Sequence, residues 1–257
     1  MRFLCLADLH IADENSDQLN QIKELLQKFD DIDVILIAGD LFDTRDLNPY
    51  EELSKLNKTV VFCLGNHEFA YSSVHATHNF FFHNYNPNKW DVHCLDILGH
   101  YTIGNINIIG NVLWYDGSLK SFSDQSDKID RSWLDSTIFQ FNYKDENKRC
   151  VDQISRSENN PLKNEDTGEK IDHTILLTHC VPHINMNVFT IEKPMSVYNM
   201  YSGVDNLFVK VPVKIDYAIC GHTHRYVKED IDGVHCINIG NDYFRYENYL
   251  RYYIIDI

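Results

Sequence analysis

Short, continuously apolar runs limit how this chain can fold more than any other feature. The first three lie at residues 2–7, 34–38 and 60–64. Between them, apolar residues recur at helical spacing over residues 17–29, and a second helix is predicted to start at Pro49 with Asn48 as its N-cap. This alternation predicts a largely parallel sheet buried on both faces, which explains why its strands are apolar throughout.

The second half of the chain has a different pattern, with many strands and few helices. Further strands are predicted at residues 106–110, 174–177, 217–220, 234–239 and 250–255. They indicate a second, partly antiparallel sheet. Residues 117–172 are mostly polar, and we expect them to form an insertion or lid within a single α/β domain that spans residues 1–257.

Five of the predicted strands are followed directly by residues whose side chains can act as metal ligands. These segments are Asp8-Leu9-His10, Gly39-Asp40, Gly65-Asn66-His67-Glu68, Thr178-His179 and Gly221-His222-Thr223-His224. Carboxylate, imidazole and amide oxygen are ligands that divalent metals accept, and their position after strands would gather them at one edge of a sheet. A turn stabilised by its own hydrogen bonds could explain one such segment, but five in this order predict a metal site.

Composition narrows the class of protein and of partner. With 257 residues, of which 44% are apolar, the chain can bury a large core. No run reaches the ~18 to 20 apolar residues of a membrane helix, and Met1 leads into a strand without a signal-peptide pattern. Seven cysteines, several inside apolar runs, suggest buried thiols rather than disulfides. We therefore expect a soluble, cytoplasmic protein.

The net charge of −15 favours small substrates over nucleic acid, because an acidic chain repels a polyanion unless a local basic groove or bound cations reverse the field. Nothing in the sequence indicates an oligomeric state.

The order of the five segments resembles that of the metallophosphoesterase superfamily, also called calcineurin-like phosphoesterases. The resemblance covers nearly the whole chain and implies a βαβ sandwich of two sheets flanked by helices, with a dinuclear metal centre. It implies that Asp40 bridges the two ions. It also implies that one ion binds Asp8, His10 and His224, and that the other binds Asn66, His179 and His222.

The same resemblance gives His67 a role in catalysis rather than in metal binding. His67 would be the general acid that protonates the leaving group, and Asp43 would hold its imidazolium in place. Glu68 fits better as a structural hydrogen-bond acceptor. Arg45, close behind Asp43, could contact a phosphate oxygen or lie at the surface.

The function implied is a metal-dependent phosphoric ester hydrolase, in which a hydroxide bridging the metals attacks phosphorus. We expect phosphomonoesters or phosphodiesters of small molecules, such as nucleotides or phosphorylated metabolites, as substrates. A DNA exonuclease and a catalytically silent metal-binding scaffold are the alternatives. Manganese is the expected metal, although iron, zinc, cobalt and nickel also accept these ligands.

One aromatic run near the predicted site allows two interpretations. Phe80, Phe81 and Phe82 could wall the substrate cleft, but an aromatic run beside a sheet more often belongs to the core.

Overall fold

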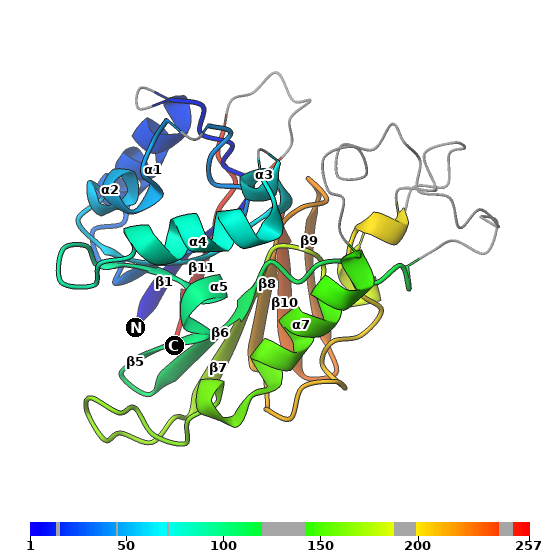
Figure 1. Cartoon of the computed structure of the whole chain (residues 1–257). Helices are drawn as coiled ribbons and strands as arrows, with labels where there is room; N and C mark the ends of the chain where they lie inside the picture. The colour runs from blue at the N-terminus through cyan, green and yellow to red at the C-terminus, as the bar shows by residue number, and fades with distance from the viewer. Residues whose placement is uncertain (14–15, 45, 71, 120–141, 188–198, 242–248) are drawn as a thin grey trace.

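Two β-sheets packed face to face form the centre of the protein (Figure 1). The structure is a computed structural model that describes residues 1–13, 16–44, 46–70, 72–119, 142–187, 199–241 and 249–257. Its first sheet has the strand order β11-β1-β2-β3-β4, and its second has the order β5-β6-β7-β8-β10-β9. The fold is therefore α/β with two mixed sheets, as the sequence predicts.

The first sheet is parallel except at one edge. Its strands are β1 (Arg2–Leu6), β2 (Val34–Ala38), β3 (Thr59–Cys63), β4 (Val92–Cys94) and β11 (Tyr253–Asp256). Strands β1 to β4 pair in parallel, and β11 pairs antiparallel with β1, with Phe3 opposite Ile255. The carboxyl ends of β1, β2 and β3 therefore lie at the same edge.

The second sheet mixes both directions. Its strands are β5 (His100–Ile103), β6 (Ile106–Asn111), β7 (His173–Thr178), β8 (Tyr217–Cys220), β9 (Tyr226–Ile231) and β10 (Val234–Ile239). Strands β6, β7, β8 and β10 are mutually parallel, and antiparallel hairpin partners β5 and β9 close the two edges.

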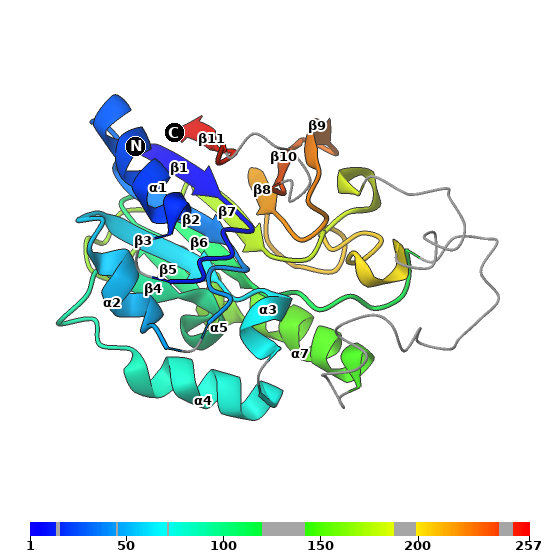
Figure 2. The same cartoon turned by 90° about the horizontal axis from the view of Figure 1, so that it is seen from above.

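Helices cover the outer faces of both sheets (Figures 1 and 2). The helices of the described residues are α1 (Asp17–Lys28), α2 (Pro49–Ser54), α3 (Asn66–Phe69), α4 (Val74–Asn84), α5 (Leu95–Leu98) and α7 (Tyr143–Ser155), with short 3-10 helices at Ser157–Asn159 and Ile184–Met186. Helix α2 begins at Pro49, and the Asn48 side chain accepts a hydrogen bond from the Tyr50 N–H at 3.1 Å. The predicted N-cap of α2 is thereby confirmed.

Alternate residues of the central strands enter two different cores. In β1, Phe3 and Cys5 pack between the sheets, whereas Leu4 and Leu6 pack toward the helices on the outer face. Both sets are fully buried. The continuous apolar runs thus have the physical cause predicted for them, because neither face of these strands meets water.

One prediction about the sheets was wrong. The last strand was expected in the second sheet, but β11 joins the first sheet beside β1. Pattern alone cannot assign an edge strand to one of two sheets, because both offer an apolar inner face. The structure also contains β4, β5, β9 and α4, which the sequence did not predict. The three strands are short or polar. Helix α4 is rich in His and Asn and is only weakly amphipathic.

All seven cysteines are buried thiols outside any disulfide, as the sequence predicts. Among the described helices, none has the length and apolar content needed to cross a membrane. Of the predicted insertion at 117–172, the structure describes residues 117–119 and 142–172, which include α7.

A buried carboxylate links the two sheets close to the edge where the predicted ligands lie. Asp96, on α5, accepts hydrogen bonds from the Leu64 N–H just after β3, at 2.7 Å, and from the Val112 N–H just after β6, at 2.9 Å. Its residue is 8% exposed. Burial raises the pKa of Asp96 to about 6, although both N–H donors favour the charged form.

This shift predicts a specific pH dependence of stability. The folded protein holds the Asp96 proton more tightly than the unfolded chain, so the contribution of this carboxyl to the free energy of unfolding is greatest below pH ~4 and declines as the pH rises to ~6. Asp96→Asn cannot titrate. Denaturant unfolding of both proteins should show that the stability of the wild type relative to the variant falls across this window. A difference in the free energy of unfolding between the two proteins that does not change with pH would contradict this role of Asp96.

Candidate metal centre

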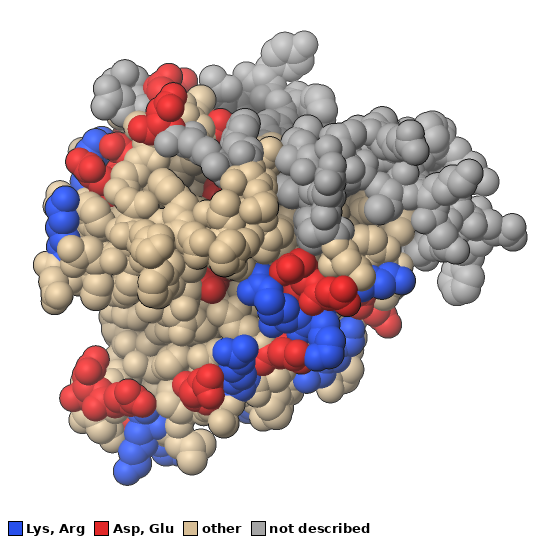
Figure 3. Space-filling model, in the orientation of Figure 1, with Lys and Arg blue, Asp and Glu red and all other residues tan. Residues whose placement is uncertain are grey.

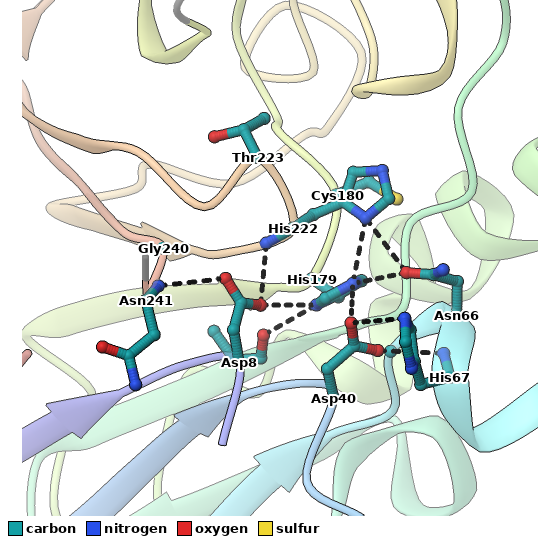
Figure 4. A network of polar contacts seen from close by, with 12 residues as sticks. Asp8, Asp40, Asn66, His67, His179, Cys180, His222, Thr223, Gly240 and Asn241 are labelled. Atoms are coloured by element: carbon teal, nitrogen blue, oxygen red, sulfur yellow. Dashed lines mark hydrogen bonds and ion pairs between the residues drawn. The ribbon is translucent and has the colours of Figure 1, made fainter. Parts of the chain in front are cut away.

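The structure brings the predicted metal ligands, His67 and Asp43 together at one edge of the two sheets. Figure 4 shows Asp8, Asp40, Asn66, His67, His179 and His222 at this edge. Their loops follow β1, β2 and β3 of the first sheet and β7 and β8 of the second. These five strands are parallel to a neighbour within their own sheet, and the loops at their carboxyl ends converge. The loops after β1 and β2 run side by side, because the His10 N–H donates to the Asp40 carbonyl at 3.0 Å.

The backbone of this edge is strained. Eight described residues other than glycine have a positive φ, and five of them are predicted metal ligands: Asp8, His10, Asp40, His222 and His224, with φ between 46° and 69°. The left-handed region costs such residues roughly 1 kcal/mol or more each. The strained backbone positions are concentrated at the predicted ligands. The loops therefore hold these side chains in a fixed orientation at a cost in their own local stability.

Two glycines permit the close approach of these loops. A Cβ on Gly65 would lie 2.1 Å from Asp40 Oδ1 and 2.3 Å from the Asp40 backbone nitrogen. A Cβ on Gly39, whose φ is +77°, would lie 2.5 Å from His179 Nδ1. Glycine at these two positions therefore leaves the space that Asp40 and His179 occupy.

One half of the site consists of three acceptor atoms that face one another. A carbonyl oxygen can only accept, so His179 Nδ1 donates to Ala38 O at 2.9 Å and His222 Nε2 donates to Tyr201 O at 2.8 Å. In the neutral rings, the other nitrogens then carry lone pairs. His179 Nε2 and His222 Nδ1 lie 3.1 Å apart, at 2.9 and 3.0 Å from Asn66 Oδ1. A positive charge, either a proton or a metal ion, is needed among them.

The other half of the site is built on Asp8, His10 and His224. Asp8 accepts hydrogen bonds from the backbone N–H groups of His222 at 2.9 Å and Asn241 at 3.3 Å, which tie the loops after β8 and β10 to β1. His224 Nδ1 lies 3.7 Å from Asp8 Oδ2 and donates to the Asn241 carbonyl. The rings of His10 and His224 stack with centroids 5.4 Å apart.

Asp40 lies between the two halves. Its Oδ2 atom is 3.4 Å from His179 Nε2 and 3.7 Å from His10 Nε2, while its Oδ1 accepts the His67 N–H at 2.9 Å. The ligand atoms of Asp8, Asp40 and His179 lie within 4.8 Å of one another, as do those of His10, Asp40 and His67. These two overlapping groups share only Asp40.

The charges of the site favour bound cations. Burial alone would lower the pKa of His179, but the carboxylates of Asp40 and Asp8 raise it to about 10. The pKa of Asp40 lies well below its usual range, because the surrounding imidazoles overcome the effect of its burial. Divalent ions would therefore replace a proton that these carboxylates already attract.

Asp43 connects the site to His67. Its Oδ1 atom lies 3.0 Å from His10 Nδ1 and 2.9 Å from His67 Nδ1, so one carboxylate oxygen orients both rings. Burial lowers the pKa of His67, but the Asp43 hydrogen bond and the charge of Asp40 raise it to about 9. The His67 side chain is 25% exposed and that of His10 is 6%, so His67 is the more open to solvent. The sequence reading paired Asp43 with His67 but missed its contact with His10.

Glu68 has the structural role predicted for it. Its Oε1 atom accepts the N–H groups of Leu41 and Phe42 at 2.8 and 3.1 Å, and its Oε2 accepts that of Gly65 at 2.6 Å. It thereby joins the loops after β2 and β3. Three carbonyls that orient imidazoles, those of Ala38, Tyr201 and Asn241, were missed because a backbone oxygen leaves no signal in sequence. Arg45 lies outside the described residues.

The approach of Gly65 to Asp40 gives a testable prediction. Gly65 has a φ of −111°, which alanine also adopts, so Gly65→Ala adds a steric conflict with Asp40 and no backbone strain. We expect at least tenfold weaker divalent-metal binding by isothermal titration calorimetry. Gly233→Ala is the control for backbone strain without a steric conflict, since Gly233 has a φ of +83° and its Cβ would meet nothing within 4 Å. This variant should lose some stability but bind metal as the wild type does. Unchanged affinity in Gly65→Ala would contradict the packing described.

Known proteins are similar to this chain in family and in fold. The family model of the calcineurin-like phosphoesterases matches residues 1–226. The structure is similar to that of phosphopantetheinyl hydrolase from Mycobacterium tuberculosis, at 14% identity and a TM-score of 0.65, over 98% of this chain and 95% of that one. A dimetal phosphatase from Danio rerio is also similar, at 13% identity and a TM-score of 0.47, over 93% and 87%.

No curated protein sequence matches this chain. The match of the family model to residues 1–226 covers most of the 257 residues. The chain therefore belongs to the calcineurin-like phosphoesterase family, whose members use a dinuclear metal centre.

Proposed function

We propose that this protein is a dinuclear-metal-dependent phosphoesterase that hydrolyses phosphomonoesters or phosphodiesters of small molecules. The first ion would be held by Asp8, His10 and His224, and the second by Asn66, His179 and His222. Asp40 would contact both ions. The donor set fits divalent metals, since it consists of carboxylate and amide oxygens and of imidazole nitrogens already oriented by other hydrogen bonds.

The position of Asp40 is the observation that supports this proposal most directly. One of its oxygens lies within 3.4 to 3.7 Å of imidazole nitrogens from both halves of the site. Two cations side by side repel each other, and a shared carboxylate reduces that repulsion. A single-metal site would need only one of the two halves.

The chain's own residues supply the rest of the chemistry. When bound, the ions would provide positive charge for the phosphate oxygens and an acidic water as nucleophile. His67, held by Asp43 through Nδ1, would present its Nε2 proton to the leaving-group oxygen. The hydrogen bond to Asp43, which raises the pKa of His67, would help the ring keep that proton, and its partial exposure would leave the ring accessible to an ester bound at the metals.

Small substrates fit the charge of the protein. A chain with a net charge of −15 repels long polyanions, while the ions would attract a single phosphate group locally. Manganese remains the predicted metal, with iron, zinc, cobalt and nickel as alternatives, and the cytoplasm remains the predicted compartment.

A substrate panel tests this function. The metal-free protein is reconstituted with each of the five metals and assayed on an aryl phosphomonoester, an aryl phosphodiester, a set of nucleotides and single-stranded DNA. We expect cleavage of one of the small-ester classes by the wild type and none by Asp40→Asn. Degradation of DNA alone would favour the exonuclease. Equal inactivity of both proteins with metals bound would favour the silent scaffold.

The role of His67 gives a separate prediction. His67→Ala should lower kcat ~10²- to 10⁴-fold, because the leaving group loses its proton donor. Metal content measured by plasma mass spectrometry should not change. His83→Ala, an exposed histidine on α4, is the control and should keep full activity. Loss of bound metal in His67→Ala would show instead that His67 is a ligand.

A further inference from the structure

The turn that follows β10, at Gly240 and Asn241, contacts the first half of the proposed metal site. A Cβ on Gly240 would lie 2.7 Å from the His224 backbone nitrogen and 2.8 Å from its Cα, so only glycine permits this approach. The Asn241 N–H donates to Asp8 Oδ2 at 3.3 Å (Figure 4), and the Asn241 carbonyl accepts the Nδ1 proton of His224. The Gly240–Asn241 turn thus holds two of the ligands proposed for the first ion.

The Asn241 carbonyl decides which nitrogen of His224 can bind a metal. A neutral imidazole has one N–H group and one lone pair, and only the lone pair binds an ion. Because the carbonyl can only accept, the proton of His224 lies on Nδ1 and the lone pair on Nε2. If the carbonyl moved, the ring could rotate or take the other tautomer. The affinity for the first ion therefore depends on the position of the Gly240–Asn241 turn.

Arg251 holds this turn from the side opposite Asp8. Its Nη1 donates to the Gly240 carbonyl at 2.6 Å, and its backbone N–H donates to Asn241 Oδ1 at 3.2 Å. The Gly240 carbonyl and the Asn241 N–H belong to one peptide unit, in which they point in opposite directions. Arg251 and Asp8 therefore bond to the two sides of the same peptide unit. A cation at the carbonyl also strengthens the N–H as a donor to the Asp8 carboxylate.

The first sheet fixes the position of Arg251. Strand β11 pairs antiparallel with β1, with Tyr253 opposite Cys5, so Arg251 lies at the carboxyl end of β1, where the metal site begins. The neighbouring Leu250 N–H donates to Gln21 Oε1 on α1 at 2.7 Å. The Gly240–Asn241 turn, in contrast, follows a strand of the second sheet. Arg251 thus joins the two sheets at the edge where the ligands converge.

The bonding of Arg251 differs from that of the cations on the face shown in Figure 3. There, Lys and Arg side chains gather over α7 beside Asp and Glu. One pair on this helix is Lys148 and Asp152, whose side chains are 74% and 55% exposed. Exposed pairs of this kind contribute at most about 1 kcal/mol. Arg251 is half-buried and donates to a backbone carbonyl beside two predicted ligands, so its effect is directed at the site.

We propose that Arg251 is a positioning residue for the first metal ion, which acts through the Gly240–Asn241 turn on the tautomer of His224 and on Asp8. The inference rests on the proposed function, which assigns these two ligands to the first ion. The imidazoles proposed for the second ion are oriented by other carbonyls, those of Ala38 and Tyr201. Loss of the Arg251 guanidinium should therefore weaken one ion and spare the other.

Isothermal titration with Mn²⁺ tests this selectivity. Arg251→Met keeps an aliphatic side chain without donors, and it should weaken one of two binding events about 10- to 100-fold, the range for groups that orient metal-binding imidazoles. Arg251→Lys can still donate to the Gly240 carbonyl and should bind more tightly than Arg251→Met. The control is Arg2→Met at the other end of β1, where Arg2 pairs with Asp31 and Asp256, and it should bind both ions as the wild type does. Unchanged affinities in Arg251→Met, equal weakening of both events, or equal affinities in the Met and Lys variants of Arg251 would overturn the proposal.

The tautomer of His224 gives a readout that needs neither metal nor substrate. In the metal-free wild type and in Arg2→Met, the ¹⁵N chemical shifts of the neutral ring should show the proton on Nδ1. In Arg251→Met, and in Asn241→Ala, which removes the acceptor of the Arg251 N–H, the tautomer with the proton on Nε2 should appear. The same tautomer in all four proteins would reject the role of Arg251.

Failure of this inference can be separated from failure of the proposed function. A wild type that binds fewer than two ions, or that cleaves no ester, would contradict the proposed function. The NMR measurement on the metal-free proteins would still show whether Arg251 fixes the His224 ring.

Discussion

The carboxylate of Asp40 lies between two sets of imidazoles, and the rest of the site is arranged around it. Three lone pairs converge on one side, from Asn66, His179 and His222, and Asp8 and His10 stand on the other. Such a cluster of acceptors and carboxylates is unstable without added positive charge. The left-handed backbone of the ligand loops, and the glycines packed against Asp40 and His179, hold these groups together, and cations bound among them would supply the missing positive charge.

The two sheets make that arrangement possible. The carboxyl ends of parallel strands lie at a common edge of their sheet. Because the two sheets pack face to face, the carboxyl ends of β1 to β3 lie near those of β7 and β8. Buried carboxylates then fix the loops: Glu68 joins the loops after β2 and β3, and Asp96 joins the first sheet to the second. Both carboxyl groups accept hydrogen bonds from backbone N–H groups of two different loops, so both hold other groups in position.

Much of this architecture could be predicted from sequence, for physical reasons. Strands buried on both faces leave continuous apolar runs, and metal-ligand residues directly after them point to one edge of a sheet. The prediction failed for β11, because an edge strand fits either sheet equally well, and for the short or polar strands β4, β5 and β9. Contacts made by backbone carbonyls, and the bridge of Asp43 between His10 and His67, depend on three-dimensional distances that no spacing in the sequence encodes.

Anomalous scattering from crystals grown with Mn²⁺ tests the central claim most directly, which is that Asp40 is shared by two cations. The account predicts two peaks about 3.5–4 Å apart, one on each side of the Asp40 carboxylate. A single peak that does not touch Asp40, or no peak in a folded protein with intact loops, would contradict it.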